Sequence, residues 1–206
     1  MSENEKKEEK PEEEKATPEA PKERCTECGY MNQAGSTYCL GCGKDISELE
    51  PVEVVFPIYV KKKVIDQITK LCKKSDLEVF GYLVGELHEW NSTKYIVISE
   101  QISVRAGTDS RDVSVQLLAD SMGLFDEKFQ KLKNKNANLL NIGWWHSHPG
   151  FGCFLSAVDL TTQREQYPSP HETALVVDPV NDDLKFFKLD GSSEKGYRED
   201  SYAIIK

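Results

Sequence analysis

The chain has 206 residues and a formal net charge of −9 at pH 7, with a sequence pI of about 5.1. This length accommodates one full domain plus a small module or tail, and the acidic balance argues against nucleic acid as a partner, because phosphate-binding surfaces are basic. No apolar run approaches the ~18 residues of a transmembrane helix, and the N-terminus lacks the apolar segment of a secretory signal, so we expect a cytoplasmic protein without a membrane partner.

The first 23 residues are dominated by charged and small side chains. They consist almost entirely of Glu, Lys, Pro, Ala, Ser and Thr. A segment with so little apolar surface cannot offset the entropy of ordering the chain, so we predict a disordered, solubilising tail over residues 1–23. A docking tail for a basic partner is the alternative interpretation.

Four of the six cysteines form two Cys-x-x-Cys pairs with ten residues between them: Cys25, Cys28, Cys39 and Cys42. Each pair can form a tight knuckle, and two knuckles complete a closed shell of four thiolates, which suits structural zinc better than disulfides in a cytoplasmic chain. So small a module has no core of its own, and the metal should hold it together. We therefore predict a zinc ribbon over residues 24–46, a linker over 47–53 and a globular domain over 54–206.

The globular part alternates between helical and strand-like patterns. In chain order, these patterns predict a helix over 60–75, strands over 77–90 and 94–104, a helix within 113–133, a strand over 139–148, a helix from 156 to about 167, and strands over 172–179 and 183–190. Helices interleaved with strands that include a hairpin are typical of a mixed α/β sheet with flanking helices, and not of a doubly wound parallel sheet.

A His-x-His pair ends the strand predicted over 139–148. Residues two apart on a strand point to the same face, so His146 and His148 can converge on one metal ion. Asp159 is the nearest third ligand, once the glycine-rich turn after Pro149 carries the chain back. Two histidines and a carboxylate leave one coordination position open, which is typical of catalytic zinc, and such zinc lowers the pKa of a bound water to about 7.

The same residues also have a purely structural interpretation. Ser156 and Asp159 stand at the spacing of a capping box, in which the serine begins a helix and the residue three further on bonds back to it. His-x-His on a strand is also found in surface and core pairs. His88 and His171 lack ligand spacing, and we predict that both are surface residues.

Hydrolysis at a zinc centre also needs a carboxylate that accepts the proton of water without being a ligand. Glu78 and Glu86 flank the strand that begins near residue 77, and both are candidates. Burial next to an apolar strand could raise the pKa of Glu78 towards neutrality, but the chemistry of the sequence does not choose between the two.

The segment from His146 to Asp159 has the spacing His-x-His-Pro-x6-Ser-x-x-Asp, which resembles the JAMM motif of MPN+ zinc metalloproteases. The runs GWWHSHPGFGCFLSAVDLTTQ and VVDPV are similar to the proteasome-lid deubiquitinase and to the catalytic subunit of the COP9 signalosome, and EVFGYLVGE is similar to an upstream segment of the same proteins. The resemblance covers about residues 54–190. It implies an MPN/JAMM-like fold with cytidine-deaminase-like architecture.

The resemblance also implies an activity and assigns roles. The activity is zinc-dependent removal of ubiquitin or a ubiquitin-like modifier from lysine conjugates. His146, His148 and Asp159 would bind zinc, and Glu78, selected over Glu86, would be the general base. Ser156 would hydrogen-bond the developing oxyanion. The alternative function is a non-catalytic MPN scaffold whose ribbon recruits partners.

Two departures from the relatives named above affect the choice of partner. This chain ends soon after the domain and carries a ribbon that they lack, so we expect an archaeal member acting on a simpler ubiquitin-like system, with proteasome components as further partners. Residues 105–115 match the region where relatives carry an insertion that contacts ubiquitin. This segment could pair with the extended ubiquitin tail as an added strand, and an ordinary mobile loop is the alternative.

Overall fold

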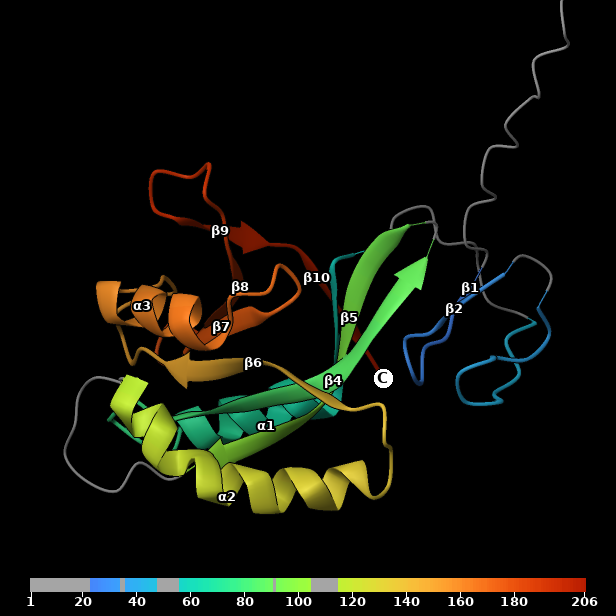
Figure 1. The fold of residues 1–206 in the computed structure, drawn as a ribbon, viewed down its shortest axis with the longest axis horizontal. Helices are drawn as coiled ribbons and strands as arrows, with labels where there is room; N and C mark the ends of the chain where they lie inside the picture. Colours follow the sequence, from blue (N-terminus) through green and yellow to red (C-terminus); the bar gives the residue numbers. More distant parts are fainter. Residues whose placement is uncertain (1–22, 34–35, 48–55, 91, 105–114) are drawn as a thin grey trace, which may run out of the picture.

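The computed structural model describes residues 23–33, 36–47, 56–90, 92–104 and 115–206 (Figure 1). Its helices are α1 (Lys62–Cys72), α2 (Val115–Lys133) and α3 (Ala157–Gln166), and its strands are β1 (Glu23–Arg24), β2 (Met31–Asn32), β3 (Ile58–Lys61), β4 (Phe80–Trp90), β5 (Thr93–Val104), β6 (Leu140–Ser147), β7 (Thr173–Asp178), β8 (Asp183–Leu189), β9 (Tyr197–Asp200) and β10 (Tyr202–Ile205). The predicted tail over 1–23, the linker over 47–53 and the loop over 105–115 lie wholly or almost wholly outside these residues, and the predicted domain boundaries stay predictions.

Eight strands form one mixed sheet in the order β10-β3-β5-β4-β6-β7-β8-β9, and β1 pairs with β2 in a separate two-stranded ribbon. The large sheet contains three parallel pairs (β10–β3, β3–β5 and β6–β7), and its other four pairs are antiparallel. The expectation of a mixed α/β sheet with flanking helices is therefore confirmed.

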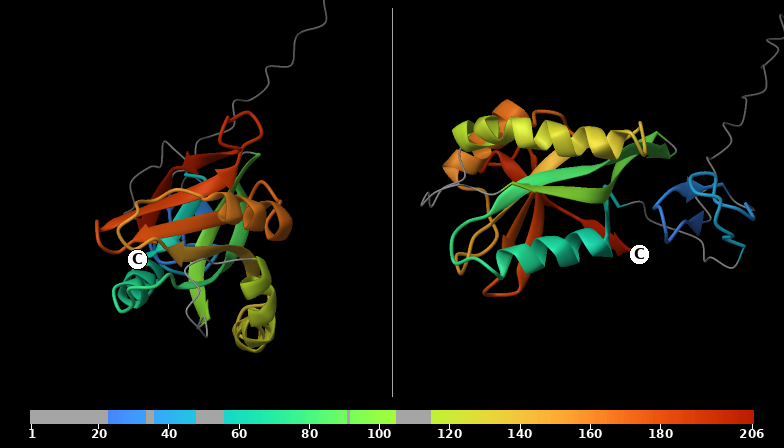
Figure 2. Two further views of the ribbon diagram at one scale, coloured as in Figure 1. Left: turned by 90° about the vertical axis from the view of Figure 1, so that its left-hand side faces the viewer. Right: turned by 90° about the horizontal axis from the view of Figure 1, so that it is seen from below.

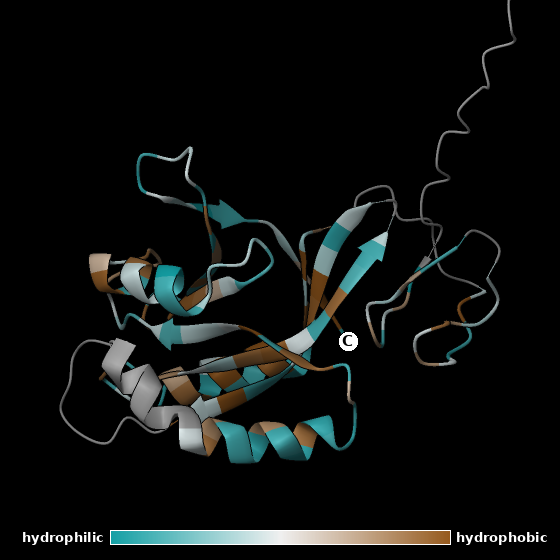
Figure 3. Cartoon of the chain, in the orientation of Figure 1, coloured by the Kyte–Doolittle hydropathy of each residue, from teal (hydrophilic) through white to brown (hydrophobic). Residues whose placement is uncertain are grey.

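The helices cover both faces of the sheet. Helix α1 lies against one face, and α2 and α3 lie against the other (Figure 2). The two adjacent tryptophans of β6 follow this division: Trp144 packs in the core on the α2 and α3 side, and Trp145 packs in the core beneath α1. Apolar residues concentrate along the central strands, as the hydropathy colouring shows (Figure 3).

The predicted helices and long strands are present, with boundaries shifted by a few residues, but three short strands of the large sheet were not predicted. These are β3, β9 and β10, each four residues long. Strand β10 pairs in parallel with β3, so Tyr202 lies beside Ile58. Four residues are too few to show a period in sequence, and their partners lie far away along the chain.

A close backbone approach fixes the position of β6 against β7. Gly143 has a φ of 154°, and a side chain there would place its Cβ only 2.0 Å from the carbonyl oxygen of Thr173. Glycine therefore permits the parallel pairing that runs from Gly143 to Ser147. This pairing carries the His-x-His segment to its place at the end of the sheet.

The cysteine-bearing ribbon packs against the end of the sheet opposite to α3 (Figures 1 and 2). Met31 inserts its side chain among Tyr59, Tyr95, Val97 and Ile205, and its backbone N–H donates to Tyr95 Oη at 3.1 Å. His88 stacks on Tyr95 with a centroid distance of 5.3 Å and meets Tyr30 edge-on at 5.7 Å. The prediction of a surface position for His88 is therefore wrong, because it lies at the junction between ribbon and sheet.

None of the helices among the described residues has the length and apolar character needed to cross a membrane.

Candidate active site and metal centres

His146 belongs to β6, and His148 follows its last residue, so both imidazoles leave the same face of the strand. Their Nε2 atoms are 3.1 Å apart, and both side chains are buried. The ring of His146 stacks on that of Trp144 at a centroid distance of 4.5 Å. The strand and this ring contact hold the pair in one orientation.

Asp159 reaches the histidines from the first turn of α3. Its Oδ1 lies 3.4 Å from His146 Nε2, and its Oδ2 lies 3.6 Å from His148 Nε2. The capping box is also present: Asp159 N donates to Ser156 Oγ at 3.2 Å, and Ser156 N donates to Asp159 Oδ2 at 2.7 Å. The structural and the metal-binding interpretations are therefore compatible, because the cap orients the carboxylate that faces the two imidazoles.

His146, His148 and Asp159 each offer a ligand atom close enough to the others to share one zinc ion. Zinc bonds of ~2.0–2.1 Å in a tetrahedral shell place neighbouring ligand atoms ~3.3 Å apart. The two Nε2 atoms are 3.1 Å apart, His146 Nε2 is 3.4 Å from Asp159 Oδ1, and His148 Nε2 is 3.6 Å from Asp159 Oδ2, all close to this value. Two neutral nitrogens and a carboxylate oxygen are also the donor set of catalytic zinc sites, so His146, His148 and Asp159 fit this metal.

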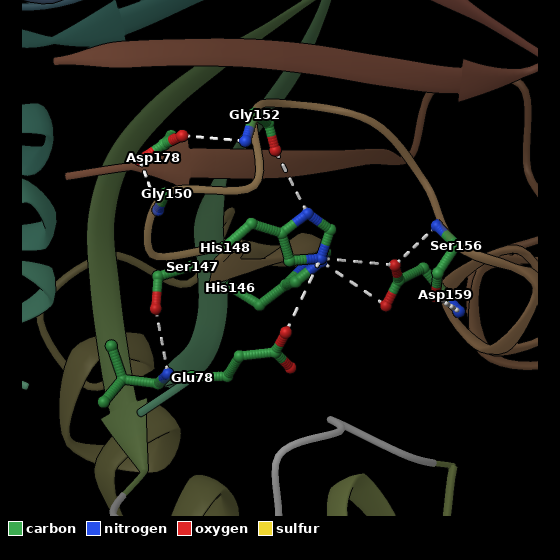
Figure 4. A network of polar contacts seen from close by, with 10 residues as sticks. Glu78, His146, Ser147, His148, Gly150, Gly152, Ser156, Asp159 and Asp178 are labelled. Atoms are coloured by element: carbon green, nitrogen blue, oxygen red, sulfur yellow. Dashed lines mark hydrogen bonds and ion pairs between the residues drawn. The ribbon is translucent and has the colours of Figure 1, made fainter. Parts of the chain in front are cut away.

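Glu78 approaches the group from a different side than Asp159 (Figure 4). It lies two residues before β4, and its Oε1 is 3.9 Å from His148 Nε2. The neighbouring Val79 fixes this position, since its N–H donates to Ser147 Oγ at 3.0 Å and its carbonyl accepts from Ser147 N at 2.9 Å. Glu86 lies elsewhere, where it accepts a hydrogen bond from Asn136.

A pocket of about 530 Å³ opens over these groups. Glu78, His148, Ser156 and Asp159 supply much of its polar lining, and Phe151 and Phe154 are among its apolar residues. The pocket therefore brings together the candidate base, two candidate ligands and the candidate oxyanion donor. His146 lies deeper, because it is fully buried behind His148.

The electrostatics favour an ionised Asp159. Burial alone would raise its pKa, but hydrogen bonds from His146, His148 and Ser156 hold the pKa well below the ordinary value. Burial lowers the pKa of His146. For His148, burial acts in the same direction, but the nearby carboxylates of Asp159 and Glu78 raise its pKa overall. An ionised carboxylate beside a buried neutral imidazole is the ligand chemistry that a metal cation needs.

Gln163 and Asp178 were not singled out from the sequence, although they support the histidine pair from outside the candidate ligand set. Trp144 Nε1 donates to Gln163 Oε1 at 2.8 Å, so α3 holds the ring on which His146 stacks. Asp178, at the end of β7, accepts hydrogen bonds from Gly150 N at 2.9 Å and Gly152 N at 2.7 Å. An aspartate that ends a fully buried strand is a local signal for such a role, but its partners lie 26 and 28 residues away.

Cys153 lies in the same loop as a packed side chain. Its Sγ donates to Val176 O at 3.3 Å, and burial raises the pKa of the thiol to about 12. A thiol with this pKa carries almost no thiolate at neutral pH, so it is unsuited to act as a nucleophile.

The four ribbon cysteines also converge. Cys25 Sγ lies 3.6 Å from Cys42 Sγ, and Cys28 Sγ lies 3.5 Å from Cys39 Sγ. Zn–S bonds of ~2.3 Å in a tetrahedral shell place sulfurs ~3.8 Å apart, so the group fits zinc. Its knuckles are alike, since the glycine after each pair has a left-handed φ and donates to the carbonyl of the first cysteine. The four thiols match a small zinc ribbon.

The described part of the chain thus combines a mixed α/β fold with a His-His-Asp group and an adjacent glutamate, which is the arrangement that zinc hydrolases use. Residues 53–170 match the family model described as JAB1/Mov34/MPN/PAD-1 ubiquitin protease. The chain belongs to this family, and its sheet is the MPN fold.

Several curated proteins are similar to this chain in sequence. The chain is 33% identical over 145 residues to the 26S proteasome non-ATPase regulatory subunit 14 of Dictyostelium discoideum, covering 68% of this chain and 44% of the relative. It is 37% identical over 107 residues to the ubiquitin carboxyl-terminal hydrolase RPN11 of Saccharomyces cerevisiae, covering 50% and 32%. It is 31% identical over 140 residues to the COP9 signalosome complex subunit 5 of Candida albicans, covering 65% and 22%.

The chain thus spans less than half the length of these curated relatives. A solution structure of a protein from Desulfitobacterium hafniense shares the fold, with a TM-score of 0.52 and 18% identity, covering 72% of this chain and 93% of the other.

Proposed function

We propose that this protein is a zinc-dependent isopeptidase that removes ubiquitin or a ubiquitin-like modifier from lysine conjugates. The observation that carries the proposal is the convergence of His146, His148 and Asp159 at zinc-ligand separations, with Glu78 and Ser156 on the same pocket. Membership of a family of ubiquitin proteases supports this choice of substrate.

Each of the five side chains has a distinct task in this proposal. Zinc held by His146, His148 and Asp159 supplies Lewis acidity towards an amide carbonyl and towards water. Glu78 takes a proton from the attacking water and delivers it to the leaving lysine amine. Ser156 Oγ already accepts from Asp159 N, so its own proton remains to donate to the oxyanion that develops on the carbonyl.

We further propose a second, structural zinc on Cys25, Cys28, Cys39 and Cys42. Four thiolates leave no open coordination position, so this ion would stabilise the ribbon and take no part in hydrolysis. The ribbon strands β1 and β2 and the helix α3, whose first turn carries Asp159, lie at opposite ends of the molecule (Figure 1), which agrees with separate tasks.

For partners, we propose conjugates of ubiquitin or a ubiquitin-like protein, together with proteasome components. The names of the relatives, a 26S proteasome regulatory subunit and a COP9 signalosome subunit, support this choice. We also propose a cytoplasmic location.

The test compares Glu78→Gln with Glu86→Gln, which makes the same change at a carboxylate outside the pocket. We expect the first variant to lose isopeptide cleavage by about 10²- to 10⁴-fold and the second to keep it, with both binding two zinc ions per chain by metal analysis. The substrate is a ubiquitin-like protein joined through its C-terminus to a lysine side chain, and product masses identify the cut.

Full activity in Glu78→Gln would remove the proposed general base. A wild-type protein that binds such conjugates but never cleaves them would instead favour the non-catalytic scaffold.

A further inference from the structure

Asp178 is a fully buried carboxylate that accepts five hydrogen bonds. Three come from its own turn: Val180 N at 3.0 Å, Asn181 N at 3.2 Å and Asn181 Nδ2 at 2.7 Å. The other two come from Gly150 N and Gly152 N, which belong to the loop that follows His148 (Figure 4). These donors hold the carboxylate rigidly, because moving it would weaken several charge-assisted hydrogen bonds to a buried charge.

Asp178 is one of three consecutive residues of β7 that hold this loop. Val177 O accepts from His148 N at 2.9 Å, and Val176 O accepts from Cys153 Sγ at 3.3 Å. Within the loop, Gly150 and Gly152 have φ values of 80° and 82°. Glycine adopts this left-handed conformation without strain, so both amides can point at one carboxylate.

The loop in turn acts on a candidate zinc ligand. Gly152 O lies 3.2 Å from His148 Nδ1. A carbonyl oxygen can only accept, so Nδ1 carries the proton in this contact. In the neutral ring the lone pair then sits on Nε2, the atom that faces His146 Nε2 and the carboxylate of Asp159.

We propose that Asp178 is a positioning residue for the metal centre: by binding the amides of Gly150 and Gly152, it holds the Gly152 carbonyl where it selects the Nδ1–H tautomer of His148. The inference rests on the proposed zinc site. It goes beyond that site because it names a group that never touches metal or substrate. Groups that orient metal-ligating histidines typically change metal affinity about 10- to 100-fold when they are removed.

The wild-type chain provides the first test, which needs no variant. Long-range ¹H–¹⁵N spectra of the histidine rings report which nitrogen is protonated. At an alkaline pH where the ring is neutral, we expect the Nδ1–H form for His148 in the metal-free protein, and slow hydrogen exchange for the amides of Gly150 and Gly152. An Nε2–H form for His148, or fast exchange at both glycines, would overturn the proposal.

The second test uses Asp178→Asn, which keeps the shape but loses one acceptor oxygen, and Asp178→Ala, which loses both. The matched control is Asp182→Asn, four residues along the chain from Asp178, at an exposed residue with a positive φ that asparagine tolerates. Zinc is titrated against a competing chelator and followed at the His146 and His148 rings, which report this centre alone, while the cysteine Cβ shifts report the ribbon.

We expect zinc binding at the histidine centre to weaken about 10- to 100-fold in the two Asp178 variants, with mixed His148 tautomers and unchanged ribbon binding. Native tautomer and zinc affinity within twofold of wild type in folded Asp178→Asn would refute the positioning role. A variant that does not fold leaves the wild-type measurement to decide.

The result is separable from the isopeptidase proposal. If no conjugate is ever cleaved, the tautomer and the zinc affinity still report on Asp178. If instead Asp178 proves irrelevant, cleavage and its dependence on Glu78 are untouched.

Discussion

The hydroxyl of Ser156 serves α3 and the pocket at once. It caps the helix by accepting from Asp159 N, and it lines the pocket beside His148. At the scale of the single residue, a structural role and a chemical role are therefore superimposed on one oxygen. The two roles can be tested separately, because capping uses the hydroxyl oxygen as an acceptor, whereas stabilising an oxyanion uses the hydroxyl proton as a donor.

Two substitutions of Ser156 should therefore differ in stability but not in activity. Ser156→Ala loses the cap, at a cost of about 1 kcal/mol in the free energy of unfolding. Ser156→Gly should cost only a few tenths of a kcal/mol, because glycine is tolerated at an N-cap. Both variants lose the oxyanion donor, so both should lose about 10²- to 10³-fold in the rate of isopeptide cleavage. Urea denaturation and turnover measured on the same samples check this. Activity that followed stability across the pair would contradict the donor role.

At the scale of elements, the end of β7 organises the loop between β6 and α3. The loop carries His148 at its start and leads into the cap of α3, so one strand end aligns ligands that come from a strand and a helix. Burial alone would raise the pKa of Asp178, but hydrogen bonds from Gly150, Asn181 and Gly152 hold this pKa well below the ordinary value.

This arrangement predicts an acid-sensitive contribution to stability. A carboxyl group whose pKa is lower in the folded state stabilises the fold fully above its unfolded pKa, ~3.9 for Asp, and loses that contribution as the pH falls towards the folded pKa. The difference in the free energy of unfolding between wild type and Asp178→Asn should stay constant above pH ~5 and shrink below pH ~4. Urea denaturation across this range measures it, with Asp182→Asn as the control for loss of one charge. A difference that did not change with pH would argue against an ionised, bonded Asp178.

At the scale of the whole molecule, the ribbon is docked on the MPN domain through aromatic side chains. Tyr95 stacks on His88, contacts Tyr59 edge-on at a centroid distance of 5.5 Å and accepts from Met31 N. The guanidinium of Arg24 lies over the Tyr59 ring at 4.8 Å. The C-terminal strand takes part as well, since Lys206 N donates to Thr26 O at 3.1 Å.

Removing one hydroxyl should loosen this docking. Tyr95→Phe leaves the buried amide of Met31 without its acceptor, so we expect a loss of about 1–3 kcal/mol in stability and faster proteolysis within the ribbon. Tyr202→Phe is the matched control, because this tyrosine packs against Phe186 and its hydroxyl makes no hydrogen bond among the described residues. Equal effects of the two substitutions would show that the hydroxyl of Tyr95 contributes nothing specific.

Features formed by residues close in sequence were predictable for a physical reason. Cys-x-x-Cys knuckles, a His-x-His pair on a strand, a capping box and amphipathic helices each depend on contacts within a few residues, which the backbone geometry of that segment imposes. Choosing Glu78 over Glu86 needed a family resemblance, because each glutamate follows the local rules equally well. The site of His88 between two tyrosines had no local signal at all.

By itself, the sequence determined the mixed α/β class, the two sets of metal-type side chains and the helix that begins at Ser156, since spacing and periodicity express short-range geometry. Only the tertiary structure decided that β10 joins the edge of the sheet beside β3, that the ribbon docks through Met31, and that Asp178 holds the loop behind His148. These contacts join residues as near as 26 positions apart, as for Gly152 and Asp178, and as far as 144 positions apart, as for Ile58 and Tyr202. They depend on which strands become neighbours, and packing of the entire sheet decides that.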